Sequence, residues 1–267
     1  MYSIFFGSSS VSMFSLVKNK KFIIRKFKGA SMMGLLKVDN KNRQQIIKII
    51  KKYENKISKL VFCFGEVDLH FGYYFNLINK GIDMDIDEKK NFKNISKDYL
   101  EFISSLDCGT GCQKVVIGPF PNCELGIHEV IKKQKIYNII DKDINESSLK
   151  PNIREKLKYQ YQKKRFLEFH SWLQKYCLQY KIKFVDTQKI CLHKNSDVKE
   201  CLVHKYNKLN IHLNWEPMIQ EIINSCGFKF INFERKHLEK LQNSFYSKRK
   251  KRNSERRIKN KKTIKNK

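Results

Sequence analysis

The sequence predicts an α/β protein, a three-layer α/β/α sandwich built on a mostly parallel sheet. Two observations indicate this fold: five short apolar runs rich in β-branched and aromatic residues, and polar segments with helical spacing between most of them. Strands that alternate with helices indicate parallel βαβ units. With 267 residues, 41% of them hydrophobic, the chain is long enough for one sizeable core.

The expected elements follow from these patterns. Strands are expected at residues 2–6, 21–27, 59–64, 114–120 and 182–186. Amphipathic helices are expected at residues 42–57, 87–106, 154–180 and 215–227. Asp39 and Asn40 are cap candidates for the first helix, Pro151 and Pro217 are start signals for the last two, and Gly227 is a stop signal.

The domain organisation is expected to be simple. Residues 1–235 form one α/β domain, and residues 236–247 form a C-terminal helical extension. The last stretch, residues 248–267, reads "KRKKRNSERRIKNKKTIKNK" and is too charged to fold alone. We therefore expect a solvated basic arm there.

The formal net charge of +29 is extreme. Such a charge predicts attraction to anionic partners, such as nucleic acid, acidic glycans or anionic surfaces, without choosing between them. The tail 248–267 is expected either to act as a nuclear-type address or to contact polyanions with a strength that falls with salt. An AT-rich coding bias, which raises the Lys, Asn and Ile content, remains the alternative explanation for the rest of the chain.

The sequence also bounds the compartment. No secretory signal is visible, and no apolar stretch approaches the eighteen or so residues that a membrane span needs. Eight cysteines are scattered along a chain that is not small, which is typical of reduced thiols. We expect an intracellular protein, cytoplasmic or nuclear, in which Cys108 and Cys112 do not form a disulfide.

Four segments at the ends of the apolar runs carry unusual residues, and in open parallel sheets functional sites lie at the carboxyl ends of strands. Each segment alone is weak, and the first alone is typical of a capped turn. No Gly-Lys-Ser/Thr follows it, so it is not a phosphate loop. In chain order the segments are "GSSS" (7–10), "KGASMMG" (28–34), "FGEVDLHFGYY" (64–74) and "NIHLNWEP" (210–217).

Taken in order, these four blocks resemble the SGNH (GDSL-type) hydrolase family, in particular the branch whose third block reads Phe-Gly-Glu-Ile/Val-Asp. The resemblance covers residues 1 to about 230 and implies an SGNH/flavodoxin-like fold. It also implies a serine ester hydrolase in which Ser9 is the nucleophile and His212 is the base. The backbone amides of Ser9 and Gly29 would then be the oxyanion donors.

The sequence departs from the family pattern at three positions. Ser8 stands where the family has aspartate, and Val67 stands where it has an oxyanion asparagine, whose loss costs on the order of a hundredfold in rate. Leu209 stands where the aspartate partner of the histidine is expected. Asn210 can orient the ring of His212 through its carbonyl oxygen but supplies no charge, so a serine–histidine dyad is the expected arrangement.

Three further residues follow the third strand. Glu66, Asp68 and His70 are expected to bind a glycan hydroxyl, to tune His212, or to hold the loop together through hydrogen bonds to backbone amides. His70 is expected on the same side of an extended segment as Asp68. The functional roles and the loop-organising role of these residues all stay open at the level of sequence.

Two other patterns favour structural explanations. Cys191, His193, Cys201 and His204 are zinc-compatible residue types, but their spacing matches no zinc-finger pattern, so free thiols and surface histidines are favoured and no metal site is expected. Segment 154–180 interleaves basic and aromatic residues, which suits nucleic-acid stacking. Inward aromatics with solvated lysines are the favoured arrangement.

The resemblance therefore implies a serine ester hydrolase that removes acyl groups of the acetyl type, with an acylated carbohydrate as the expected substrate and no cofactor. Two alternatives remain. The first is a catalytically degraded SGNH-fold protein that binds a glycan or another polyanion. The second is a basic nucleic-acid-binding protein whose binding depends on its tail.

Overall fold

The structure is a computed structural model that describes residues 1–17, 19–88, 90–194, 197–203 and 213–228. The chain divides into two compact units, residues 1–15 with 19–230 and residues 16–18 with 231–267. The sheet lies in the first unit. The expected helical extension and basic tail, residues 236–267, lie outside the described residues.

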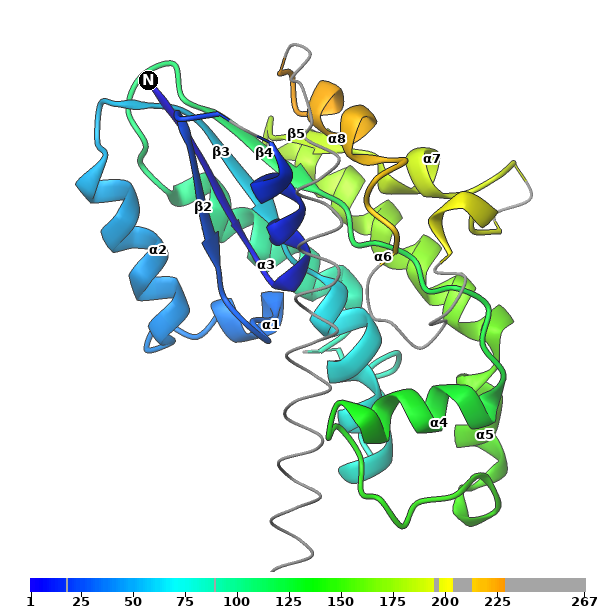
Figure 1. The fold of residues 1–267 in the computed structure, drawn as a ribbon. Coiled ribbons are helices and arrows are strands. Elements are labelled where there is room, and N and C mark those ends of the chain that lie inside the picture. Colours follow the sequence, from blue (N-terminus) through cyan, green and yellow to red (C-terminus); the bar gives the residue numbers. More distant parts are fainter. Residues whose placement is uncertain (18, 89, 195–196, 204–212, 229–267) are drawn as a thin grey trace, which may run out of the picture. The chain divides into compact units, whose positions relative to one another are not determined.

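A five-stranded, fully parallel sheet forms the centre of the first unit (Figure 1). Its order is β2-β1-β3-β4-β5, the flavodoxin-like order, in which β1 and β3 flank the point where the chain reverses its direction across the sheet. The strands are β1 (Tyr2–Gly7), β2 (Phe22–Lys26), β3 (Ile57–Cys63), β4 (Gln113–Ile117) and β5 (Lys183–Val185).

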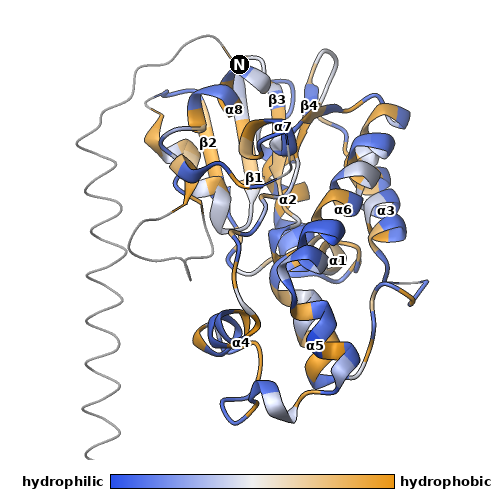
Figure 2. Ribbon diagram, turned by 90° about the vertical axis from the view of Figure 1, so that its right-hand side faces the viewer, coloured by the Kyte–Doolittle hydropathy of each residue, from blue (hydrophilic) through white to orange (hydrophobic). Residues whose placement is uncertain are grey.

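Helices cover both faces of the sheet, with α3 and α6 on one face and η1 and α8 on the other (Figures 1 and 2). The α-helices are α1 (Met32–Leu35), α2 (Lys41–Lys52), α3 (Phe92–Ser105), α4 (Ile127–Ile136), α5 (Pro151–Leu157), α6 (Tyr159–Gln179), α7 (Thr187–Cys191) and α8 (Ile219–Ser225). The 3-10 helices are η1 (Ser9–Leu16), η4 (Glu146–Ser148) and η5 (Glu200–Leu202), and the π-helical segments are η2 (Asp68–Gly72) and η3 (Phe75–Asn79). Within the described ranges, no helix is long and apolar enough to cross a membrane.

Alternate side chains of β1 fill the two layers of the core. The ring of Phe5 lies 4.4 Å from that of Phe14 in η1 and 5.7 Å from that of Phe228 after α8. The next ring, Phe6, lies 5.6 Å from that of Phe62 in β3. Side chains of a strand point to opposite faces in turn, and a parallel sheet covered on both faces has almost continuously apolar strands. This explains why the strands could be recognised in the sequence.

The expected helix at 154–180 is wrong in one respect, because the structure holds two helices there. Lys158 has an extended backbone (φ −62°, ψ 144°), which ends α5 and begins α6. Pro151 opens α5 in the first helical position, as expected.

Other boundaries differ at capping residues. Asn40 caps α2, but the helix ends at Lys52, three residues before the left-handed Asn55 (φ 61°). The next helix, α3, begins only at Phe92 because Asn91 is its cap, so the acidic residues of segment 87–91 lie outside it. The fourth strand ends at Ile117, short of the expected residue 120.

Candidate functional site

The three serines of the first block have different environments. Ser8 and Ser10 are buried, whereas Ser9, the first residue of η1, is half-buried. The hydroxyl of Ser10 donates a hydrogen bond to the carboxylate of Glu66, and the hydroxyl of Ser8 has no partner among the described residues. Ser9 is therefore the serine of this block whose side chain reaches the surface.

Close contact between strands fixes the first block. A Cβ atom on Gly7 would lie 2.5 Å from the carbonyl oxygen of Cys63, so only glycine fits at the end of β1. The Ser8 N–H donates to this same carbonyl (3.1 Å), and the Phe27 N–H donates to the carbonyl of Gly7 (2.8 Å). Backbone hydrogen bonds therefore join the carboxyl ends of β2, β1 and β3 next to the first block.

The second block forms a tight turn after β2. Its hydrogen bond runs from the Ala30 N–H to the Phe27 carbonyl (3.1 Å), and Gly29 at its third position has a φ of +71°. This left-handed conformation suits glycine, which has no Cβ to clash. Gly29 is exposed, with no atom within 4 Å of the place where its Cβ would be.

The third block is helical and holds the second block in place. The carboxylate of Asp68 accepts hydrogen bonds from the N–H groups of Met32 (2.7 Å) and Met33 (3.1 Å), the first two residues of α1. These amides have no partner within their own helix, and a carboxylate at a helix N-terminus is favoured. Asp68 is 1% exposed, and burial raises its pKa to about 6.

Glu66 links the third block to the first. Its side chain is buried, and burial raises its pKa to about 7 against the opposing effects of the hydrogen bond from Ser10 and the charge of Lys133. Both carboxyl groups are therefore enclosed in protein. The first three of the four predicted blocks are joined to one another by hydrogen bonds of Gly7, Ser10, Glu66 and Asp68.

The expected extended segment after Asp68 is wrong, because η2 is helical and sends the two side chains apart. Asp68 contacts α1, whereas His70 Nε2 donates to the carbonyl of Phe120 (2.8 Å). His70 Nδ1 accepts from the amide of Asn122 (2.9 Å), whose oxygen accepts from Lys133 Nζ (2.8 Å). The amide nitrogen of Asn122 can only donate, so Nδ1 of His70 is the acceptor and Nε2 is the donor in this arrangement.

Two residues of this hydrogen-bond network, Lys133 and Asn122, were not among those predicted from the sequence. Lys133 is 3% exposed on α4, and burial lowers its pKa to about 8. It lies three residues after the buried Val130, so helical periodicity would have placed it on the inner face. Asn122 lies in a loop after β4, where no periodic signal exists.

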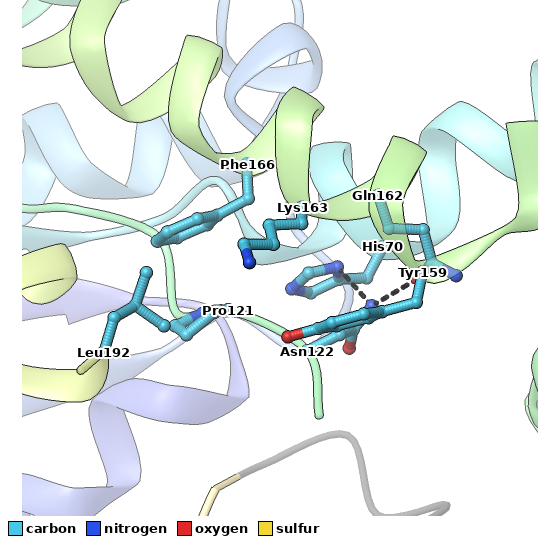
Figure 3. Close-up of a pocket in the computed structure, with 8 residues that line it drawn as sticks. All are labelled: His70, Pro121, Asn122, Tyr159, Gln162, Lys163, Phe166 and Leu192. Atoms are coloured by element: carbon cyan, nitrogen blue, oxygen red, sulfur yellow. Dashed lines mark hydrogen bonds between the residues drawn. The ribbon is translucent and has the colours of Figure 1, made fainter. Parts of the chain in front are cut away.

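A shallow pocket opens beside this network (Figure 3). Its cavity volume is only about 10 Å³, and it lies between α6 and the loop after β4. Asn122 lies between the ring of His70 and the amide of Gln162, which accepts from it at 3.3 Å. The lining residues are His70, Pro121, Asn122, Tyr159, Gln162, Lys163, Phe166 and Leu192.

A buried arginine of α6 anchors that helix to the third block. The guanidinium of Arg165 in α6 donates from Nη2 to the carbonyl of Leu69 (2.6 Å), and its centre lies 3.2 Å from the centre of the Tyr73 ring. Phe166 and Phe169 are buried as well, while Lys164 is exposed. Phe166 and Phe169 of α6 thus face inward together with one basic side chain, whereas Tyr159, Tyr161 and Trp172 are half-buried.

The remaining sequence predictions divide between described and undescribed residues. His212, Asn210 and Leu209 lie outside the described residues. All eight cysteines are free thiols.

The zinc-compatible residue types have other contacts. Cys191 is buried and its thiol donates to the sulfur of Met218 (3.7 Å), while His193 contacts the carboxylate of Glu200 (3.0 Å). Cys201 is exposed, and His204 lies outside the described residues. In the part of the chain that the structure describes, no three His, Cys, Asp or Glu side chains gather as a metal site.

No protein-family model and no curated protein matches the sequence. Among solved structures, one from Streptococcus pneumonia whose name refers to platelet activating factor aligns with a TM-score of 0.51 at 13% identity, over 84% of this chain and 81% of that one.

Two esterase structures align less closely. A catalytic mutant of an acetylxylan esterase from Geobacillus stearothermophilus has a TM-score of 0.46 at 8% identity, over 87% of this chain and 97% of that one. The native aryl esterase of M. smegmatis has a TM-score of 0.47 at 8% identity, over 85% and 97%. The similarity to the first structure, together with the strand order, confirms the three-layer α/β fold that the sequence predicts.

Proposed function

We propose that the chain is a serine ester hydrolase whose nucleophile is Ser9, and that it removes acetyl-type acyl groups from a carbohydrate. One observation carries the proposal: the first three blocks are hydrogen-bonded to one another at the carboxyl edge of the sheet, with Ser9 as the surface-reaching serine among them. Open parallel sheets bind ligands at this edge, next to the point where the strand order reverses.

The proposed reaction has two halves. Ser9 Oγ attacks the ester carbonyl while His212 accepts the hydroxyl proton, and the amides of Ser9 and Gly29 hold the oxyanion. The intermediate collapses to an acyl-serine, and His212 returns the proton to the leaving alcohol. Water then attacks the acyl group with the same base and releases the carboxylic acid and free Ser9.

The buried side chains of the third block have a different role in this proposal. Glu66 and Asp68 are almost fully enclosed, and their hydrogen bonds go to Ser10 and to the start of α1. They fit the loop-organising alternative of the sequence prediction rather than contact with a substrate. Val67 supplies no side-chain donor, so the proposed oxyanion site relies on backbone amides, and a modest rate is expected.

The proposal is tested by measuring the hydrolysis of p-nitrophenyl acetate. Ser9→Ala is expected to lower kcat/KM by about a thousandfold or more, because the nucleophile is lost. Ser12→Ala, a half-buried serine in the same 3-10 helix, is the matched control and should stay within about threefold of the native chain. Release of acetate from an acetylated sugar should be faster than release of the fatty acid from the same sugar carrying a long-chain acyl ester.

The result that contradicts the proposal is equally direct. Equal turnover by the native chain and Ser9→Ala would end the assignment of Ser9. A folded native chain that hydrolyses no ester would favour the second candidate, a catalytically degraded protein that binds its ligand, which the residues Val67 and Leu209 suggest.

A further inference from the structure

A second hollow lies at the edge of the sheet opposite to Ser9, where the strands begin. It has a volume of about 430 Å³ and lies around the start of the chain, which is marked N in Figure 1. Tyr2 opens β1, Lys21 precedes β2 and Lys56 precedes β3. These strands are neighbours and parallel, so their beginnings meet at one edge. The lining residues are Met1, Tyr2, Lys20, Lys21, Asn55 and Lys56.

The hollow is strongly basic. Lys20, Lys21 and Lys56 are exposed, and none of the lining residues is acidic. A fourth ammonium group, that of Lys52, lies 5.7 Å from the centre of the Tyr53 ring, which packs edge-on against Tyr2 at 5.4 Å. The nearest acid along the chain, at position 54, is exposed and does not line the hollow.

The sheet holds the backbones of these lysines in place. The Tyr2 N–H donates to the carbonyl of Lys56 (2.6 Å), and the Ser3 N–H donates to the carbonyl of Lys21 (3.0 Å). Asn55 has a left-handed backbone (φ 61°), which turns the chain immediately before β3. The lysines that precede β2 and the lysine that precedes β3 therefore lie on backbone held by the sheet. A concave surface lined by such like charges focuses their electric field on a bound anion.

We propose that this hollow binds a chain of phosphate groups, such as the di- or triphosphate of a nucleotide or an inorganic polyphosphate. Ammonium groups bind phosphate as point charges, and cations from two connections span more than one phosphate. Tyr2 and Asn55 line the same hollow, and both side chains carry a group that can donate a hydrogen bond. The volume of about 430 Å³ lies within the range of small-molecule sites.

This site is independent of the proposed esterase. It uses no residue of the four blocks and lies at the amino ends of the strands, whereas Ser9 follows the carboxyl end of β1. Ser9→Ala should therefore bind tripolyphosphate as tightly as the native chain. Failure of ester hydrolysis would leave this proposal standing, and failure of phosphate binding would leave the esterase standing.

Calorimetry with inorganic tripolyphosphate on the full chain tests the proposal. The triple variant Lys20→Gln, Lys21→Gln, Lys56→Gln should bind at least about tenfold more weakly, because three phosphate contacts are lost. A control triple removes the same charge at exposed positions of α3, α4 and α6 and should stay within about twofold. Its substitutions are Lys97→Gln, Lys132→Gln and Lys164→Gln.

Several outcomes overturn the proposal. Equal weakening by both triples would reduce the effect to net charge, and orthophosphate binding as tightly as tripolyphosphate would exclude a phosphate chain. Lys21→Gln alone, at an exposed position, should fold and must also bind tripolyphosphate more weakly than the native chain.

A comparison with ATP identifies the ligand. ATP binding as tight as that of tripolyphosphate identifies the phosphate chain as the ligand, and ATP binding about tenfold tighter identifies a nucleotide.

Discussion

Glu66 and Lys133 carry opposite charges in one buried region, and burial drives each of them towards its neutral form. The pKa of Glu66 is raised to about 7 and that of Lys133 is lowered to about 8. Their mutual attraction opposes these shifts without cancelling them. Glu66, which accepts from Ser10, and Lys133 therefore change their charge close to neutral pH, which is unusual for a carboxyl group and an ammonium group.

Stability should report this change at Glu66. Its pKa in the folded chain lies above the usual 4.5, so the folded chain binds the proton more tightly than the unfolded chain. The resulting stabilisation is fully present below about pH 4.5 and is lost as the pH rises through about 7. Glu66→Gln should therefore remove up to about 3 kcal/mol of this pH dependence, measured by urea unfolding near pH 5 and near pH 8.

An exposed glutamate provides the control for this measurement. Glu101→Gln, on the surface of α3, should leave the difference in unfolding free energy between the two pH values unchanged. If Glu66→Gln retained the full native pH dependence, the buried carboxyl would not be its source.

At the scale of elements, α1 depends on a residue that is distant in sequence. The helix has only four residues, too few to be stable by itself. Its Ser31 cap accepts from the Gly34 N–H (2.9 Å), and Asp68 accepts from its first two amides. The third block thus determines where the second block lies.

Asp68→Ala should loosen this connection. A buried amide, that of Met32, and a part-buried one, that of Met33, would lose their acceptor, which is expected to lower the free energy of unfolding by about 1–3 kcal/mol, measured by urea unfolding near pH 7. Asp98→Ala, at an exposed position on α3, should change stability by no more than about 0.5 kcal/mol. A loss no larger than that of the control would show that α1 is held by other contacts.

The same elements show how far sequence reasoning reaches. The buried strands were predictable because continuous apolar runs between polar segments are rare outside a covered parallel sheet, as in β1 and β3. The positions of the first three blocks followed from strand order. Short elements such as α1 were missed because four residues carry no periodicity, and their capping partners are distant along the chain.

The detailed contacts of the site were not predictable. Ser10 and Glu66 are 56 positions apart, and only the pairing of β1 with β3 brings them together. The π-helical turn η2 sends the side chains of Asp68 and His70 in different directions, although they were expected on the same side. Such turns have no clear sequence signature. The position of Asn122 depends only on the conformation of the loop after β4.

At the scale of the whole molecule, the parallel sheet separates two candidate sites. Its carboxyl edge carries Ser9, and its amino edge carries the lysine-lined hollow. The first 38 residues, which include Ser9 and the lysines at positions 20 and 21, contain no acidic residue. Attraction of anionic ligands by the folded region is thus proposed separately from the polyanion contact of the tail, residues 248–267.

We propose that the fold turns Ser9, one of three adjacent serines, into a nucleophile. Reaction with a serine-directed fluorophosphonate, followed by mass-spectrometric mapping of the adduct, tests this proposal. One adduct is expected at Ser9, absent in Ser9→Ala and present in Ser12→Ala. A folded chain that forms no adduct, or that carries it at Ser8 or Ser10, would rule out Ser9 as the nucleophile.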